Sequence, residues 1–192
     1  MLFSSIVFLF TFLSVILILY YLVPRRLKNA LLLLCSLVFY AWGEPVYIFL
    51  MIFSIIFNYI SGLDIARNLK NRRAARGSLI FNLIVNLGIL GFFKYEGFLL
   101  DSLNRVLPVD IPYRELALPI GISFYTFQIL SYIIDVYRQN VKAQKNFMDF
   151  ALYVTMFPQL IAGPIVRYSD IEKQLHSRQE SFRKFGDGAM FF

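Results

Sequence analysis

The chain has 192 residues, of which 58% are hydrophobic and only 16% charged, whereas soluble domains carry about a quarter charged residues. The apolar residues form long uncharged runs such as 3–23, and a ~30 Å hydrocarbon core needs roughly 20 helical residues. These features exclude a soluble enzyme, a disulfide scaffold and a disordered chain. The net charge of +7 comes from basic residues between apolar runs, which is typical of a polytopic membrane protein and not of a nucleic-acid binder.

Five apolar runs predict membrane helices, in the order 3–23, 30–42, 46–63, 78–93 and 119–137. The second run would give only about 20 Å of helix. It must extend through the next loop, tilt, or form a hairpin with the third run, and the sequence leaves all three open. We expect the fifth helix to begin near its proline, because proline fits the first turn of a helix. A short amphipathic helix at the membrane interface is expected over residues 98–107.

Lys and Arg are divided unequally between the loops on the two sides of the predicted bundle. The loops 24–28, 64–76 and 138–146 hold eleven of them, whereas the loops 43–45 and 95–115 hold two. Because cytoplasmic loops carry an excess of Lys and Arg, the first set is predicted to be cytoplasmic and the N-terminus outside.

A sixth apolar segment, residues 147–166, is flanked by basic residues on both sides and contains Pro158, Gly163 and Pro164. A straight span would place one basic flank outside, so a broken or re-entrant helix that returns to the cytoplasmic side is favoured. Irregular backbone at membrane depth is tolerated only where protein or a water-filled cavity surrounds it. This segment is therefore the best indication of a functional cavity.

The residues after the broken segment predict a helix on the cytoplasmic surface. Ser169 and Glu172 have the spacing of a capping box, and the basic, amphipathic stretch 170–183 follows. Its single histidine, His176, lies among charged residues, which favours a solvated surface side chain. Glycines and fresh apolar residues in 186–192 indicate entry to another membrane helix, so we expect this chain to be the N-terminal part of a longer protein.

Polar residues at helical spacing on the third and fourth helices predict contacts between helices. They are Ser54, Asn58 and Ser61 on the third helix and Asn82 and Asn86 on the fourth. Membrane helices place such side chains toward one another rather than toward lipid. We therefore expect interhelical hydrogen bonds here and no chemistry.

The fifth helix carries Gln128 and Asp135 on one polar face. Asp135 lies near the predicted cytoplasmic end of the helix. A carboxylate at this position is equally well explained by a capped or solvated side chain and by a functional one. Gln128 lies deeper, where an amide without a partner would be costly, so it either meets a neighbouring helix or lines a polar cavity. The sequence contains no cluster of metal ligands, no phosphate-binding glycine loop and no serine elbow.

Four stretches resemble a known family. They read YAWG at 40–43, LPIGISFYTFQ at 118–128, IIDVYR at 133–138 and FPQLIAGPIVRY at 157–168. Together they resemble the membrane-bound O-acyltransferases, and within that family the bacterial alginate O-acetylase branch. The resemblance runs from the first residue to about Leu175 and agrees with an all-α, polytopic transmembrane helical bundle.

The resemblance implies an O-acyltransferase, with acetyl the expected group, in the bacterial cytoplasmic (inner) membrane. Such enzymes take an acyl group from a cytoplasmic thioester, such as acetyl-CoA, and pass it through a tunnel toward an exported polysaccharide such as alginate or a cell-wall glycan. The implied partners are membrane lipid, an extracytoplasmic acetyltransferase protein and the polysaccharide, with no nucleic acid and no bound cofactor or metal. A transporter or channel-like bundle and a non-catalytic scaffold are the alternatives.

The candidates for the tunnel or its donor side are Gln128, Asp135, Gln159, Gly163, Pro164 and Arg167. Arg167 and Lys173 could attract an anionic donor, and a positive-inside role explains them equally well. The family's catalytic histidine is expected in a later apolar segment, and its role does not transfer to His176. Residues 1–192 are thus expected to form the N-terminal part of one membrane-embedded acyltransferase domain and to be inactive alone.

Overall fold

The computed structural model describes residues 7–106, 118–162 and 166–176, together with positions 178, 181, 183, 186 and 190. Every element of the described residues is a helix, which confirms the predicted all-α class. The elements are η1 (Phe8–Leu13), α1 (Ser14–Leu22), η2 (Arg25–Leu27), α2 (Lys28–Gly43), α3 (Ile48–Arg67), α4 (Arg72–Val106), α5 (Ile122–Tyr137), α6 (Phe147–Thr155), α7 (Phe157–Ala162) and α8 (Tyr168–His176). Helix α3 and the Arg72–Phe98 part of α4 are long and apolar enough to cross a membrane.

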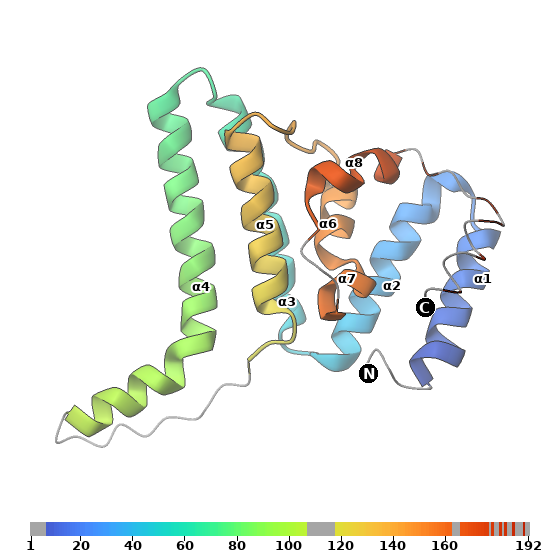
Figure 1. The fold of residues 1–192 in the computed structure, drawn as a ribbon, viewed down its shortest axis with the longest axis horizontal. Helices are drawn as coiled ribbons and strands as arrows, with labels where there is room; N and C mark the ends of the chain where they lie inside the picture. Colours follow the sequence, from blue (N-terminus) through green and yellow to red (C-terminus); the bar gives the residue numbers. More distant parts are fainter. Residues whose placement is uncertain are drawn as a thin grey trace.

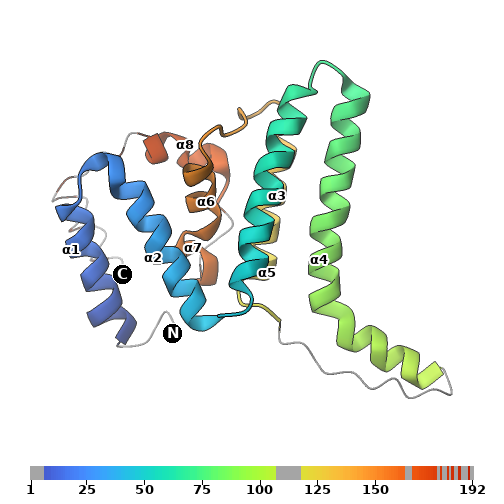
Figure 2. The same ribbon diagram turned by 180° about the vertical axis from the view of Figure 1, so that it is seen from behind.

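The helices form a broad bundle with α1 at one edge and α4 at the other (Figures 1 and 2). Between them, α3 packs beside α5, while α2 packs beside the shorter α6 and α7. The main core lies where α2, α3, α5 and α6 meet, and it is built from large apolar and aromatic side chains such as Met51, Ile129 and Phe150. Its position places the broken sixth segment in the middle of the bundle.

The three stretches predicted to be basic loops lie at one end of the bundle, which we call the basic end (Figure 1). They comprise the connection 24–27 between α1 and α2, the turn 68–71 between α3 and α4, and residues 138–146 between α5 and α6. The opposite end carries the turn 44–47 between α2 and α3. The grouping agrees with the alternation expected from the distribution of Lys and Arg.

Several predicted helix ends were wrong because hydropathy marks membrane depth and not the end of a helix. Helix α2 has 16 residues, since Lys28, Asn29 and Gly43 extend the predicted run. Helix α3 continues to Arg67 and α4 begins at Arg72, so only four residues of the predicted loop 64–76 form the turn. Charged residues continue a helix readily once it leaves the hydrocarbon.

The predicted interfacial stretch is helical over its described residues 98–106, but it continues α4 without interruption, and the last turns of α4 bend away from the bundle (Figure 1). The predicted start of the fifth helix was wrong. Helix α5 begins at Ile122 and not at Pro119, whose carbonyl accepts a hydrogen bond from the Ile122 N–H at 3.2 Å. Gly121 ends that turn with φ 76°, a left-handed conformation that favours glycine.

The predicted hydrogen bonds between the third and fourth helices are confirmed. Asn58 Oδ1 accepts from Asn82 Nδ2 at 2.7 Å and from Asn86 Nδ2 at 2.9 Å, and Asn58 Nδ2 donates to Asn86 Oδ1 at 3.0 Å. All three amides are buried, with at most 4% of each residue exposed. We call these three residues the asparagine network. It joins α3 to α4 with its polar atoms bonded to one another.

Candidate functional site

The sixth segment is broken, as its prolines and glycine predicted. Asn146 caps the start of α6, because its Oδ1 accepts from the Met148 N–H at 3.0 Å, and the helix stops before Met156, where ψ is 109°. The Phe157 N–H then donates to Ser36 Oγ of α2 at 3.4 Å and α7 begins. Pro158 lies in the first turn of α7, where a missing N–H costs no helical bond.

The chain then returns to the end of the bundle from which α6 started. The Tyr153 hydroxyl of α6 donates to the Val166 carbonyl at 3.1 Å, and Gln144 Nε2 donates to the Tyr168 hydroxyl at 2.8 Å. Helix α8 consequently lies at the basic end, beside the start of α6 (Figure 1). Two of the predicted site residues, Gly163 and Pro164, lie outside the described residues.

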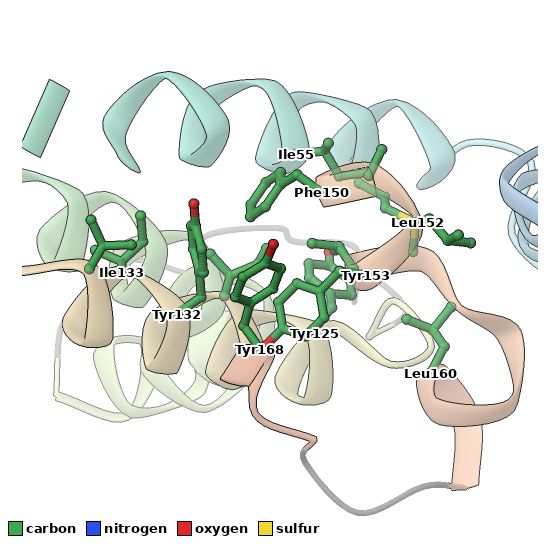
Figure 3. Close-up of a cluster of buried hydrophobic side chains, with 14 of the residues drawn as sticks. Ile55, Tyr125, Tyr132, Ile133, Phe150, Leu152, Tyr153, Leu160 and Tyr168 are labelled. Carbon is green, nitrogen blue, oxygen red and sulfur yellow. The ribbon is translucent and has the colours of Figure 1, made fainter. Parts of the chain in front are cut away.

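Four aromatic rings hold the returning chain against α5 and α6. The Tyr132 ring centroid lies 5.0 Å from that of Phe150 and 5.1 Å from that of Tyr168, while the centroids of Tyr153 and Tyr168 are 5.3 Å apart (Figure 3). Burial, together with the nearby Glu172 carboxylate, raises the pKa of the Tyr168 hydroxyl, which stays neutral. Edge-to-face and tilted pairs of this kind stabilise a contact beyond their buried area. This cluster was not predicted from the sequence, although Phe150 and Tyr153 have the spacing of one helical face.

The predicted capping box at the start of α8 is wrong. The helix begins at Tyr168, so Ser169 lies inside its first turn, where its hydroxyl donates to the Asp170 carboxylate at 3.1 Å. Arg167 is exposed just before the helix, and its carbonyl accepts from the Asp170 N–H at 3.1 Å. Lys173 and His176 belong to the helix, but their side chains lie outside the described part of the molecule.

The sequence left two environments open for Gln128, a contact with a neighbouring helix or a polar cavity, and the structure shows the first. Its Nε2 donates to the Tyr153 carbonyl at 2.8 Å, and its own carbonyl accepts from the Ser131 hydroxyl at 2.7 Å. Gln128 therefore meets the neighbouring α6, at the point where that helix approaches its break. Asp135 has a local partner, because its Oδ1 accepts from Asn140 Nδ2 at 3.0 Å.

Two of the stretches that carry the family resemblance touch each other at Gly121. A Cβ atom added to Gly121 would lie 2.8 Å from the Leu160 carbonyl oxygen of α7. Contact this close leaves no room for a side chain, so glycine is required both by φ and by space. The start of α5 thereby sets the position of α7.

A buried carboxylate that was not predicted from the sequence joins three elements at the basic end. Asp149 of α6 is 3% exposed, and its two oxygens accept from Asn29 Nδ2 at 2.7 Å and Asn146 Nδ2 at 3.0 Å. Asn29 Nδ2 also donates to the Leu175 carbonyl of α8 at 3.0 Å. An acidic residue inside an apolar segment was the signal that could have identified it.

Helices α1, α2, α7 and α8 enclose an apolar cleft of about 300 Å³, which we call the α7 cleft. Its lining residues are Leu13, Ile16, Leu17, Tyr20, Leu32, Met156, Phe157, Gln159, Ile171, Gln174, Leu175 and Arg178. Tyr20 lies toward the basic end, where its hydroxyl accepts from Arg178 Nη1 at 3.5 Å and its ring lies 4.3 Å from Lys28 Nζ.

Gln159 is the predicted site residue that the structure places in this cleft. Its Oε1 is buried and finds no donor among the described residues, as is also true of the Tyr40 and Tyr125 hydroxyls elsewhere in the bundle. A buried acceptor without a donor costs roughly 1–3 kcal/mol, and Gln159 is the predicted site residue at which such an acceptor lies beside a cleft. No group of three potential metal ligands occurs among the residues described.

The chain is similar along its whole length to bacterial O-acetylases. It is 46% identical to a probable alginate O-acetylase from Pseudomonas aeruginosa and 43% identical to one from Pseudomonas syringae pv. tomato; each match covers 100% of this chain and 38% of the relative. A peptidoglycan O-acetyltransferase from Helicobacter pylori is 34% identical over 99% of this chain and 41% of its own length.

The chain thus spans about two fifths of the length of the curated relatives it matches. No family model matches the chain, and no solved structure matches it. The relatives confirm the resemblance that the four sequence stretches predicted.

Proposed function

We propose that this chain, which is similar to probable alginate O-acetylases, forms the N-terminal part of a membrane-bound O-acyltransferase that acetylates an exported polysaccharide. The whole-chain similarity to a probable alginate O-acetylase carries this proposal. Alginate and a cell-wall glycan are the two acceptor classes, because one relative is named for each. An extracytoplasmic acetyltransferase protein is the proposed partner, and the catalytic histidine is assigned to a part of the enzyme beyond these residues.

The proposed orientation places the basic end in the cytoplasm and the N-terminus outside, in the bacterial inner membrane. Support comes from the excess of Lys and Arg in the connections at the basic end, which are typical of cytoplasmic loops. In this orientation α6 and α7 form a re-entrant segment that starts and finishes in the cytoplasm, and α8 lies on the cytoplasmic surface. Broken backbone at membrane depth then lies where protein surrounds it, as the absence of water in lipid requires.

The α7 cleft is the proposed route for the acyl donor. Most of its lining side chains are apolar, Arg178 lines it toward the basic end where Lys28 contacts the Tyr20 ring, and it contains the buried Gln159 acceptor. A thioester donor such as acetyl-CoA carries phosphates, which the cations would attract, and a chain with amide N–H groups, one of which would satisfy Gln159 Oε1. Arg167 follows α7 in the chain and is proposed to border the same route, while Gly163 and Pro164 stay candidates from the sequence alone.

Acetyl transfer by the full-length protein tests this proposal. Labelled acetyl-CoA and purified polysaccharide are supplied to the wild type and to Gln159→Leu in liposomes. Loss of one buried hydrogen bond to the donor should lower kcat/KM about tenfold. The melting temperature should not fall, because the amide oxygen that is removed has no partner within the described protein. A lower kcat/KM with an unchanged melting temperature would therefore indicate that Gln159 acts in binding, whereas a lower melting temperature would indicate a role in folding.

Gln174→Leu is the matched control, because Gln174 lines the same cleft but is exposed. We expect its kcat/KM to stay within twofold of the wild type. Equal losses in both variants would contradict the assignment of Gln159, and a wild type that neither hydrolyses the labelled thioester nor transfers its acetyl group would contradict the enzyme itself. Saturable uptake of substrate into vesicles with the thioester unchanged would favour a transporter instead.

A further inference from the structure

A second cavity lies at the basic end, between the last turns of α3 and α5 and the connection to α6. Its volume is about 680 Å³, and we call it the basic cavity. It is lined by Leu63, Ala66, Arg67, Leu69, Val136, Gln139, Val141, Lys142, Ala143 and Lys145. It shares no lining residue with the α7 cleft, so the donor route does not account for it.

The charged side chains that line this cavity are all basic. Arg67, Lys142 and Lys145 are exposed at its rim, and none of its lining residues is acidic. The floor is apolar, with Val136 and Val141 both buried. A ligand that fits must combine negative charge with a hydrophobic part.

The connection that carries two of these cations is held rigidly in place. The Gln144 N–H donates to the buried Tyr132 hydroxyl at 2.8 Å, and the Lys145 carbonyl accepts from the Tyr59 hydroxyl at 2.6 Å. Gln139, which also lines the cavity, has φ 64°, and no other described residue except Gly121 has positive φ. A left-handed residue that is not glycine costs free energy and persists only where its surroundings hold it. The cavity is therefore a built feature and not a loose surface loop.

We propose that the basic cavity binds the headgroup of an anionic phospholipid. Cationic pockets between membrane helices at the cytoplasmic side suit such headgroups, because the cations contact the phosphate and the helix sides receive the acyl chains. In the proposed orientation, the last turns of α3 and α5 lie at the depth of the cytoplasmic headgroups. The inference depends on that orientation and not on which acyl group or acceptor the enzyme uses.

A soluble phosphate compound would use the same three cations, so the test separates the two sources. Full-length protein is placed in nanodiscs of phosphatidylcholine with increasing phosphatidylglycerol, and bound phosphatidylglycerol is measured by native mass spectrometry. Each cation near the membrane surface contributes about a factor of five in affinity. Lys142→Gln/Lys145→Gln should therefore weaken phosphatidylglycerol binding about 10- to 30-fold. Competition by millimolar inorganic phosphate or glycerophosphate that displaces the lipid would overturn the assignment to lipid.

The matched control is Lys70→Gln/Arg73→Gln. Lys70 and Arg73 are exposed cations that also lie at the basic end, but they do not line the cavity. Replacing both removes the same amount of charge as the first double substitution. We expect this control to bind phosphatidylglycerol within twofold of the wild type. An equal loss in both double variants would mean general attraction to an anionic surface, and unchanged binding in Lys142→Gln/Lys145→Gln would likewise refute the site.

Discussion

Buried amides are hydrogen-bonded differently in two regions of the molecule. One region is the contact between α3 and α4, and the other is the α7 cleft. In the asparagine network, Asn58 accepts two hydrogen bonds and donates to both Asn86 and the Ser54 carbonyl. In the α7 cleft, Gln159 Oε1 is equally buried but has no donor among the described residues. A polar group without a partner in an apolar region is costly, so a protein keeps one where something outside that part of the chain completes it.

The comparison separates polar residues that hold helices together from a polar residue that lines a cleft and has an acceptor without a donor among the described residues; in the proposed function this second kind receives a ligand. Both kinds look alike in sequence, because each is a single amide within an apolar run. The distinguishing feature is whether the hydrogen bonds close within the protein. Gln128 belongs with the first kind, since the Tyr153 carbonyl accepts its Nε2 at 2.8 Å.

Breaking the closed network should have the largest effect. Asn58→Leu removes the acceptor of two buried amide donors, each of which costs roughly 1–3 kcal/mol when unpaired. We expect the free energy of unfolding of the full-length protein to fall by about 3 kcal/mol, measured by reversible unfolding in detergent. Replacing Asn58, Asn82 and Asn86 together by Leu should recover most of that loss, because no donor remains unpaired. A triple variant less stable than the single one would contradict a purely structural role.

The contact between α5 and α7 should respond next most strongly. Gly121→Ala places a Cβ atom 2.8 Å from the Leu160 carbonyl oxygen in a left-handed conformation. We expect a loss of about 2 kcal/mol in stability and a lower rate of acetyl transfer, because α7 borders the proposed donor route. Gly88→Ala is the control: it lies within α4 with nothing within 4 Å of the added atom, and it should be neutral or slightly stabilising. Similar losses in both variants would refute the special role of Gly121.

The smallest effect is expected at Asp135. Its carboxylate is partly exposed and accepts from Asn140 Nδ2, as a helix-end residue does. Asp135→Asn should therefore change acetyl transfer by less than twofold and stability by about 0.5 kcal/mol or less. A tenfold loss of kcat would contradict this local role and would support the expectation that Asp135 lines the route of the acyl group.

The sequence predicted those features that depend on local spacing or on the membrane as solvent. Asn58, Asn82 and Asn86 were paired correctly because lipid offers no alternative partner. The break near Pro158 followed from the two prolines and the glycine around it. Helix ends such as Arg67 were missed because a charged residue outside the hydrocarbon ends an apolar run without ending a helix.

The parts that sequence could not supply depend on contacts between distant residues. The requirement for glycine at position 121 becomes visible only when the Leu160 carbonyl lies beside it. The pairing of Asn29 with Asp149 spans 120 positions, and no periodicity predicts it. Gln159 was chosen within a motif, but only the cleft and its missing donor distinguish it from its neighbours.

The bonds of Asn29 also bear on the order in which the bundle assembles during synthesis. Its side chain lies at the start of α2, and its two partners, Asp149 and the Leu175 carbonyl, are synthesised 120 and 146 residues later. Until then α2 lacks its hydrogen bonds to α6 and α8 at the basic end. Contacts between residues so distant in the chain form slowly. We therefore expect α1 and α2 to remain exposed to chaperones and membrane proteases longer than the local α3–α4 pair, which can dock as soon as α4 has entered the membrane.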